Sequence, residues 1–331
     1  MIPALRLLPV LVVIACLGAH LVAADAPAPA QPPATPKPAT PAPPVGPPPT
    51  LANVPYGPHE RQVLDFYKSE STKPTPLLFF IHGGGWVAGD KKNPGMLKQC
   101  LAAGISVVSI NYRYSWQAQL AGVKPPVKAP LEDAARALQF VRSKAAEWNI
   151  DKQRIGASGG SAGACSSLWL ALHPDMADPK SSDPIAREST RLWTAAVSGA
   201  QTSLDPQQLK EWTPNSRYGG HAFGFMDPND TKTRDTRFAE FLEHRAEVLP
   251  WIKEYSPIEH ASADDPAIYL FYNAAPGLGQ EQKDPTHTSN YGVKLQEKLR
   301  SLGVACEFVY PGAPNVKHAT MEAFLIETLK K

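Results

Sequence analysis

Two overlapping copies of the pattern Gly-x-Ser-x-Gly lie in the segment GASGGSAGA, residues 156–164. This pattern is typical of a strand that turns sharply into a helix and carries a reactive serine at the turn. We expect the strand to run through Ser158 and the helix to begin near Ala162. The second copy then places Ser161 at the apex, where its hydroxyl would be exposed for attack on a carbonyl carbon.

A run of three glycines lies earlier in the chain, in the segment IHGGGW, residues 81–86. Backbone without side chains can approach a substrate closely, and its N–H groups can stabilise the oxyanion that forms during acyl transfer. We expect Gly84 and Gly85 to donate two such hydrogen bonds, and Ala162, which follows Ser161, to donate a third. A flexible loop without a ligand is the alternative, and the occurrence of both motifs in this order argues against it.

The motifs HGGGW and GGSAG together resemble those of the α/β-hydrolase fold. Within that fold, the stretches VPYGPHERQVLDFY, FFIHGGGWVAGDKK and SINYRY are similar to bacterial carboxylesterases of the branch related to hormone-sensitive lipase, including acetylxylan and feruloyl esterase-like members. The resemblance covers residues 54–331 and is weak between residues 205 and 262. It implies a serine nucleophile, an acid and a histidine, in that chain order.

The resemblance places the histidine after the last strand of the sheet. His318, in the segment CEFVYPGAPNVKHATMEAF, has that position and precedes the final expected helix. We therefore predict that His318 is the general base for Ser161 and then the general acid toward the leaving group.

The acid departs from the family pattern, because no aspartate directly follows the segment AIYLFYN. Asp284 comes later, ahead of the next helix, and we predict that it orients the histidine. Asp-Pro also suits a helix start, which is the structural alternative for Asp284. The rivals for the acid are Glu281, Asp264 and Asp265. His287, close to Asp284, is a candidate for a supporting or substrate contact.

These residues need a scaffold, and apolar runs alternate with helical patterns along the chain. The expected strands are residues 61–69, 76–83, 104–114, 154–161, 194–201, 267–274 and 306–312. Helical periodicity follows between them, for example from Leu131 to Trp148 and from Met321 to Leu329. The alternation predicts a doubly wound, mostly parallel sheet of about eight strands. Residues 205–262 interrupt it after the sixth strand and are predicted to form an inserted lid.

The first residues predict export. Residues 1–24 have one arginine, an apolar run and small residues near Ala24, as in a cleaved signal peptide. Alternatives are lipid attachment at Cys16, which lies in a lipobox-like sequence, and an uncleaved anchor. Residues 25–50 are rich in proline and predict an extended linker. The catalytic domain would then be residues 51–331 in the periplasm or outside the cell, without a membrane span in the mature protein.

The net charge of +2 gives no reason to expect a nucleic acid partner. The sequence contains four cysteines in no metal-binding spacing, Cys16, Cys100, Cys165 and Cys306, and it does not fix whether any two pair. Histidines 59, 173, 221, 244 and 260 are scattered and form no H-E-x-x-H pattern. We expect neither a metal nor an organic cofactor.

The sequence thus predicts a serine hydrolase that cleaves short-acyl or aromatic carboxylic esters, carried by a small molecule or a polysaccharide. The same residues would serve an amidase, a peptidase or a formamidase. A third interpretation is a binding module on a hydrolase fold, which the displaced acid favours.

Overall fold

The computed structural model describes residues 46–331. The predicted signal peptide, the alternative lipid attachment at Cys16 and most of the proline-rich linker lie outside these residues. Within residues 46–331, no helix combines the length and the apolar character that crossing a bilayer requires.

Eight strands form one sheet in the order β1-β2-β4-β3-β5-β6-β7-β8. Their bounds are β1 Leu51–Pro55, β2 Val63–Tyr67, β3 Thr75–Ile81, β4 Ser106–Ile110, β5 Ile150–Gly160, β6 Thr194–Ser198, β7 Ala267–Phe271 and β8 Cys306–Val309. At one edge of the sheet, β2 pairs antiparallel with both β1 and β4. The other pairings, from β4 across the sheet to β8, are all parallel. The central strands are buried on both faces, which explains their continuous apolar runs.

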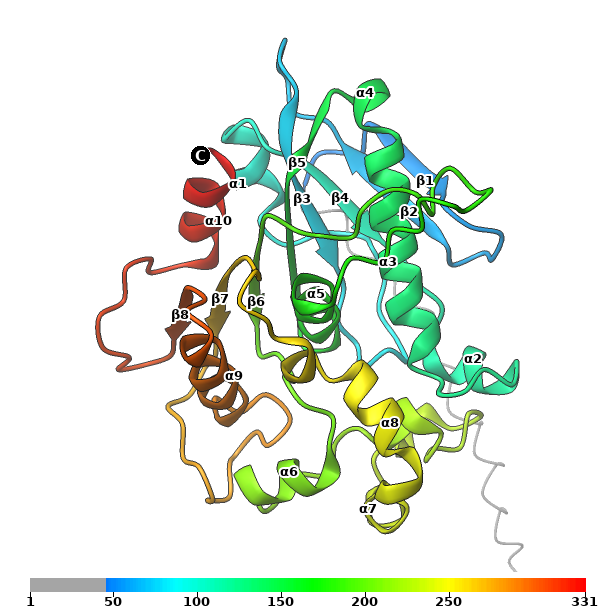
Figure 1. Ribbon diagram of the computed structural model, residues 1–331, viewed down its shortest axis with the longest axis vertical. Helices are drawn as coiled ribbons and strands as arrows, with labels where there is room; N and C mark the ends of the chain where they lie inside the picture. Colours follow the sequence, from blue (N-terminus) through cyan, green and yellow to red (C-terminus); the bar gives the residue numbers. More distant parts are fainter. Residues whose placement is uncertain (1–45) are drawn as a thin grey trace, which may run out of the picture. The chain divides into compact units, whose positions relative to one another are not determined.

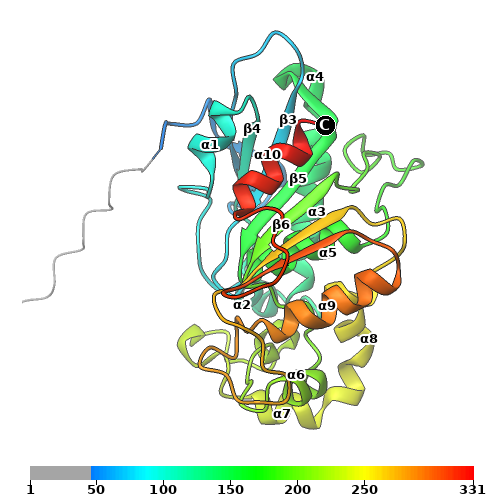
Figure 2. The same cartoon turned by 90° about the vertical axis from the view of Figure 1, so that its left-hand side faces the viewer.

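Helices cover both faces of the sheet (Figure 1). They are α1 Leu97–Ala102, α2 Ser115–Leu120, α3 Lys128–Ser143, α4 Ala145–Trp148, α5 Ala162–Leu172, α9 Asn290–Ser301 and α10 Met321–Leu329. α1 and α10 pack on one face, where Leu97, Phe324 and Leu325 are buried together with Leu78 of β3. α3 and α5 cover the other face, as Figure 2 also shows. The predicted α/β-hydrolase fold class is confirmed.

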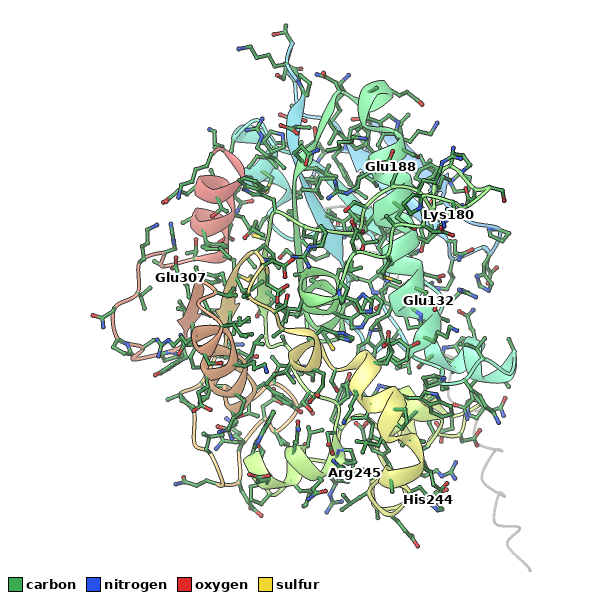
Figure 3. The ribbon with its side chains drawn as sticks, in the orientation of Figure 1. Glu132, Lys180, Glu188, His244, Arg245 and Glu307 are labelled. Atoms are coloured by element: carbon green, nitrogen blue, oxygen red, sulfur yellow. The ribbon has the colours of Figure 1, made fainter. Side chains whose placement is uncertain are left out.

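The segment between β6 and β7 carries α6 Pro206–Trp212, η1 Gly220–Phe223, η2 Thr231–Thr233, α7 Phe238–Glu243, α8 Arg245–Tyr255 and η3 Pro257–His260. We call this segment the lid. Its helices α6, α7 and α8 lie beyond the carboxyl end of the sheet (Figures 1 and 2). Asp205 caps α6 and also accepts two hydrogen bonds of 2.6 Å from Arg245, which is labelled in Figure 3. This ion pair ties the beginning of the lid to the beginning of α8.

Candidate active site

Ser161 lies at the turn between β5 and α5 and has φ 55° and ψ −124°. A positive φ is unusual for a residue with a Cβ and stores strain that the surroundings must hold. The surroundings do so through the Ser161 N–H, which donates to the Ser198 carbonyl oxygen over 3.0 Å, and the Ser161 carbonyl, which accepts from Cys165 over 2.9 Å. Ser158, by contrast, lies within β5 and is 1% exposed. Ser161 is therefore the serine at the apex.

Glycines allow the segment after β3 to pack directly against this turn. A Cβ placed on Gly163 would lie 2.1 Å from the Ile81 carbonyl oxygen, which no real side chain tolerates. A Cβ on Gly83 would lie 2.7 Å from the Gly160 carbonyl oxygen and 3.6 Å from the Ser161 Cβ. The glycine run thus lies beside the serine, backbone against backbone.

His287 is the histidine that the fold brings to the serine. The Ser161 hydroxyl donates to the Nε2 of His287 over 2.9 Å, and the Nδ1–H of His287 donates to the Asp284 carboxylate over 2.9 Å. The other Asp284 oxygen accepts from the N–H groups of Thr286 and His287, each over 3.2 Å. Serine, imidazole and carboxylate therefore form one connected hydrogen-bond chain of the kind that activates a serine nucleophile.

The segment between β7 and α9, residues 272–289, is held in place by the turn that follows β6. Gln201, just after β6, donates to the Thr286 carbonyl oxygen over 2.7 Å. A Cβ placed on Gly199, which has φ +58°, would lie 3.3 Å from the Cβ of His287, so the imidazole rests directly on this turn. The His287 side chain is 37% exposed, which leaves the site open to an incoming substrate.

The prediction of His318 as the general base is wrong. Its Nδ1 lies 2.7 Å from Glu307 of β8 and its Nε2 lies 2.7 Å from Glu327 of α10, so both ring nitrogens are engaged. The hollow that His318 lines also contains Ala267 and Ile268, which begin β7. His318 therefore lies toward the amino end of the strands, whereas Ser161 follows the carboxyl end of β5. In Figure 3, Glu307 marks this region, away from Arg245 in the lid.

Chain order suggested a histidine after β8, whereas the histidine that contacts Ser161 follows β7. The sequence contained a local signal for it, because Asp284 and His287 are separated by only two residues. The rival acids lie elsewhere. Asp264 and Asp265 are within 3.5 Å of Arg191, and Glu281 is exposed and is not bonded to His287.

The glycine run has the backbone geometry that a set of peptide donors requires. Gly84 and Gly85 have φ values of +103° and +61°, which strongly favour glycine. The Gly84 carbonyl accepts from Val87 and Ala88, which closes a tight turn. Among the described residues, the N–H groups of Gly84 and Gly85 donate to no backbone carbonyl, and the N–H of Ala162, the first residue of α5, has no acceptor within the helix. They remain available for a substrate oxygen.

His82, directly before the glycine run, supports the turn and stays neutral. Its Nδ1 lies 2.7 Å from the Gly83 carbonyl oxygen, and its ring stacks on Tyr112 with centroids 4.2 Å apart. The Tyr112 hydroxyl donates to the carbonyl oxygens of His82 and Gly83. Burial lowers the pKa of His82 to about 4, so this imidazole carries no charge at neutral pH.

The lid reaches the glycine run through Arg234 and Asp235. A Cβ on Gly85 would lie 1.9 Å from the Arg234 guanidinium, which shows how closely the two approach. The Arg234 Nε donates to Asp235 over 3.1 Å, and Asp235 lies 3.5 Å from the fully buried His221. Burial lowers the pKa of His221. The neighbouring Asp235 carboxylate acts in the opposite direction and raises this pKa, but burial has the larger effect. The lid therefore presents a cation beside the expected oxyanion donors.

The chain matches the model of the BD-FAE family over residues 64–298. It therefore belongs to the BD-FAE family. The matched residues include Ser161, Asp284 and His287 and end before His318.

The chain is similar to esterases among characterised proteins. It is 24% identical to Esterase LipQ of Mycobacterium tuberculosis over 81% of this chain and 56% of LipQ. It is 30% identical to Esterase LipC of the same organism over 66% of this chain and 49% of LipC. The chain thus spans about half the length of these relatives.

Solved structures share the fold at low sequence identity. A truncated carbohydrate esterase from gut microbiota has a TM-score of 0.60 and 21% identity, covering 85% of this chain and 96% of that one. The acetyl ester-xyloside bifunctional hydrolase from Caldicellulosiruptor lactoaceticus has a TM-score of 0.55 and 24% identity, covering 75% and 76% of the two chains.

Proposed function

We propose that the protein is an exported serine esterase that cleaves carboxylic esters through an acyl-enzyme on Ser161. The observation that carries the proposal is the continuous chain from the Ser161 hydroxyl through His287 to Asp284, with both links at 2.9 Å. The named esterases among its relatives support ester cleavage over other acyl transfers.

In the first half of the reaction, the Ser161 oxygen attacks the ester carbonyl carbon while its proton passes to the Nε2 of His287. Asp284 accepts the Nδ1–H and stabilises the imidazolium that forms. The carbonyl oxygen becomes negatively charged and receives hydrogen bonds from the N–H groups of Gly84, Gly85 and Ala162. When the carbonyl reforms, the carbon–oxygen bond to the alcohol breaks, and His287 returns the proton to the leaving oxygen.

In the second half, water replaces the alcohol. His287 removes a proton from the water as it attacks the acyl carbon, and the same N–H groups hold the second oxyanion. The bond to Ser161 then breaks, its oxygen recovers the proton from His287, and the carboxylic acid leaves. The partial exposure of His287 gives water access to the imidazole.

The names of structural neighbours and the amino-terminal sequence support a substrate class. Two structural neighbours are named as acting on carbohydrates or acetyl esters, which supports a short-acyl ester carried by a saccharide. The amino-terminal pattern of residues 1–24 supports export, where such substrates occur. Ester and amide substrates share the machinery described above, and the esterase names alone favour the ester.

A fluorophosphonate probe tests the nucleophile directly. The mature protein should form one covalent adduct on Ser161, seen by peptide mass spectrometry, and Ser161→Ala should abolish it. Ser158→Ala is the matched control, since Ser158 lies in the same motif but inside β5. An adduct on another residue, or none, would refute the mechanism.

A matched p-nitrophenyl ester and p-nitroanilide pair tests the choice of substrate. We expect the acetyl ester to be hydrolysed with a far larger kcat/KM than the anilide of the same acid. Equal or reversed values would instead indicate an amidase or peptidase with the same catalytic residues.

A further inference from the structure

A second group of polar side chains lies at the far end of α5, away from Ser161. His173 directly follows α5, Glu254 is in the last turn of α8, and His260 ends η3. One ring nitrogen of each histidine and one oxygen of the carboxylate lie within 4.8 Å of one another. None of the three takes part in the proposed reaction.

Backbone carbonyls fix which ring nitrogens carry hydrogen. The Nδ1 of His173 lies 2.8 Å from the Pro174 carbonyl oxygen, and the Nε2 of His260 lies 2.6 Å from the Glu254 carbonyl oxygen. A carbonyl oxygen can only accept, so each of these nitrogens is a donor. In the neutral imidazoles, the Nε2 of His173 and the Nδ1 of His260 therefore present lone pairs.

The His173 lone pair faces another acceptor. Its Nε2 is 3.2 Å from Oε1 of Glu254, and the two histidine rings approach to a centroid separation of 4.5 Å. Two acceptors face each other favourably only when a proton or a cation lies between them. Two imidazoles and a carboxylate, with the other ring nitrogens held by carbonyls, are the donor set and the supporting contacts typical of zinc sites.

We propose that His173, Glu254 and His260 bind a divalent transition-metal ion of the zinc type, with water as the fourth ligand. Tetrahedral ligands at zinc distances lie about 3.3 Å apart. The His173–Glu254 separation already fits that value, and the largest separations must shorten by at most about 1.5 Å. Glu254 has a side chain exposed by 48% and can rotate to make this adjustment.

The position of the site indicates a structural role. α5 begins beside the nucleophile, while α8 and η3 form the end of the lid. Trp169 of α5 already donates to the Glu254 carbonyl over 2.8 Å, so the metal would strengthen an existing contact between α5 and the lid. We expect the metal to raise thermal stability and to leave ester hydrolysis measurable in its absence.

The test uses the full mature chain, stripped with a chelator and titrated with Zn²⁺ by calorimetry, with Co²⁺ absorption as a second readout. We expect one equivalent to bind with micromolar or tighter affinity, a rise in Tm, and Co²⁺ d–d bands of a tetrahedral site. His173→Gln, His260→Gln and Glu254→Gln should each weaken binding at least about tenfold.

The control is His244→Gln. His244 lies at the start of α8 and is labelled in Figure 3. Its Nδ1 is 2.8 Å from Oε1 of Glu247, so it forms a histidine–glutamate pair like that of the proposed site but lacks a second histidine. It should leave Zn²⁺ binding unchanged. If a histidine variant folds poorly, Glu254→Gln still decides the question because its side chain is partly exposed. Absence of saturable binding, or binding that all three variants retain, would overturn the proposal.

Discussion

Two segments of this protein each bring a histidine to carboxylates, and only one of them reaches the serine. In residues 272–289, His287 binds Asp284 through Nδ1 and keeps Nε2 for Ser161. In residues 310–320, His318 gives both nitrogens to Glu307 and Glu327. A histidine bonded to one carboxylate can transfer a proton, whereas one held between two is fixed as a structural tie. In this protein, the number of carboxylates bonded to a histidine indicates whether it can serve Ser161 better than its position along the chain does.

The largest expected effect separates the two histidines. His287→Ala should lower kcat/KM by about 10⁴-fold or more, because the base that accepts the Ser161 proton is lost. His318→Ala should leave kcat/KM within about twofold, because it shares no partner with Ser161, while Tm falls as Glu307 and Glu327 lose their common donor. Steady-state kinetics on an acetyl ester and thermal unfolding measure both. The comparison fails if His318→Ala is the inactive variant.

The carboxylates beside the two histidines should differ in the same way. Loss of the one beside His287 should lower kcat, and loss of the one beside His318 should not. Asp284→Asn should lower kcat by about 10³-fold, less than the roughly 10⁴-fold known for buried triad carboxylates, because Asp284 is 62% exposed and water can partly replace it. Glu307→Gln, its counterpart beside His318, should leave kcat unchanged. Similar rates for Asp284→Asn and the unaltered protein would move the role of acid to another residue.

The glycine run should affect the rate, whereas a glycine elsewhere should not. Gly84→Ala should lower kcat by about 10²- to 10³-fold, because the residue has φ +103° and its new Cβ would lie 2.2 Å from the Ala88 carbonyl oxygen, so the turn that holds the N–H donors must shift. Gly104→Ala is the matched control, since Gly104 has φ +79° with nothing within 4 Å of the added Cβ.

The double variants of Gly84→Ala sharpen this comparison. With His287→Ala, the small residual rate should fall further, because the activity left without the base comes from the oxyanion donors and substrate binding. With His318→Ala, kcat should equal that of Gly84→Ala alone. A residual rate of His287→Ala that Gly84→Ala does not change would contradict the assignment of the glycine run to the oxyanion.

The smallest effect concerns the pH dependence of stability around His318. Hydrogen bonds from Lys331, His318 and Lys317 hold the pKa of Glu327 well below its usual range. Because the folded protein binds that proton less readily than the unfolded chain, the stabilisation is present above about pH 4.5 and is lost as the pH falls. Glu327→Gln should therefore lower Tm by a few degrees at most at pH 7, and by progressively less as the pH falls below about 4.5 toward the lowered pKa of the folded protein. A Tm difference that is constant with pH would contradict this account.

The sequence predicted the scaffold and the position of Ser161 at the turn between β5 and α5 because both depend on local signals. Buried parallel strands need apolar runs, and a turn as tight as that at Ser161 needs glycines at 159 and 163, where added side chains would strike the β3 carbonyls. The histidine was misassigned because order along the chain does not fix which of two segments turns toward the carboxyl edge. That choice depends on tertiary contacts such as the hydrogen bond from Gln201 to Thr286.

The histidine–glutamate cluster was beyond the reach of sequence patterns for a related reason. Its members, His173, Glu254 and His260, come from the ends of three different elements. Glu254 lies 81 positions after His173 in the sequence. Zinc motifs are recognisable in a sequence when ligands share a helix or a hairpin. Here the packing of the lid on the end of α5 brings them together, and only the folded arrangement reveals it.

In the proposed mechanism, the four residues from Asp284 to His287 carry both the proton acceptor and the carboxylate that orients it. In such an arrangement, the imidazole keeps its orientation toward its carboxylate even when the surrounding segment shifts as a body. No residue after β8 has a role in that mechanism. Substitutions there should therefore act on stability and leave the contact between the Asp-Pro-Thr-His unit and Ser161 unchanged.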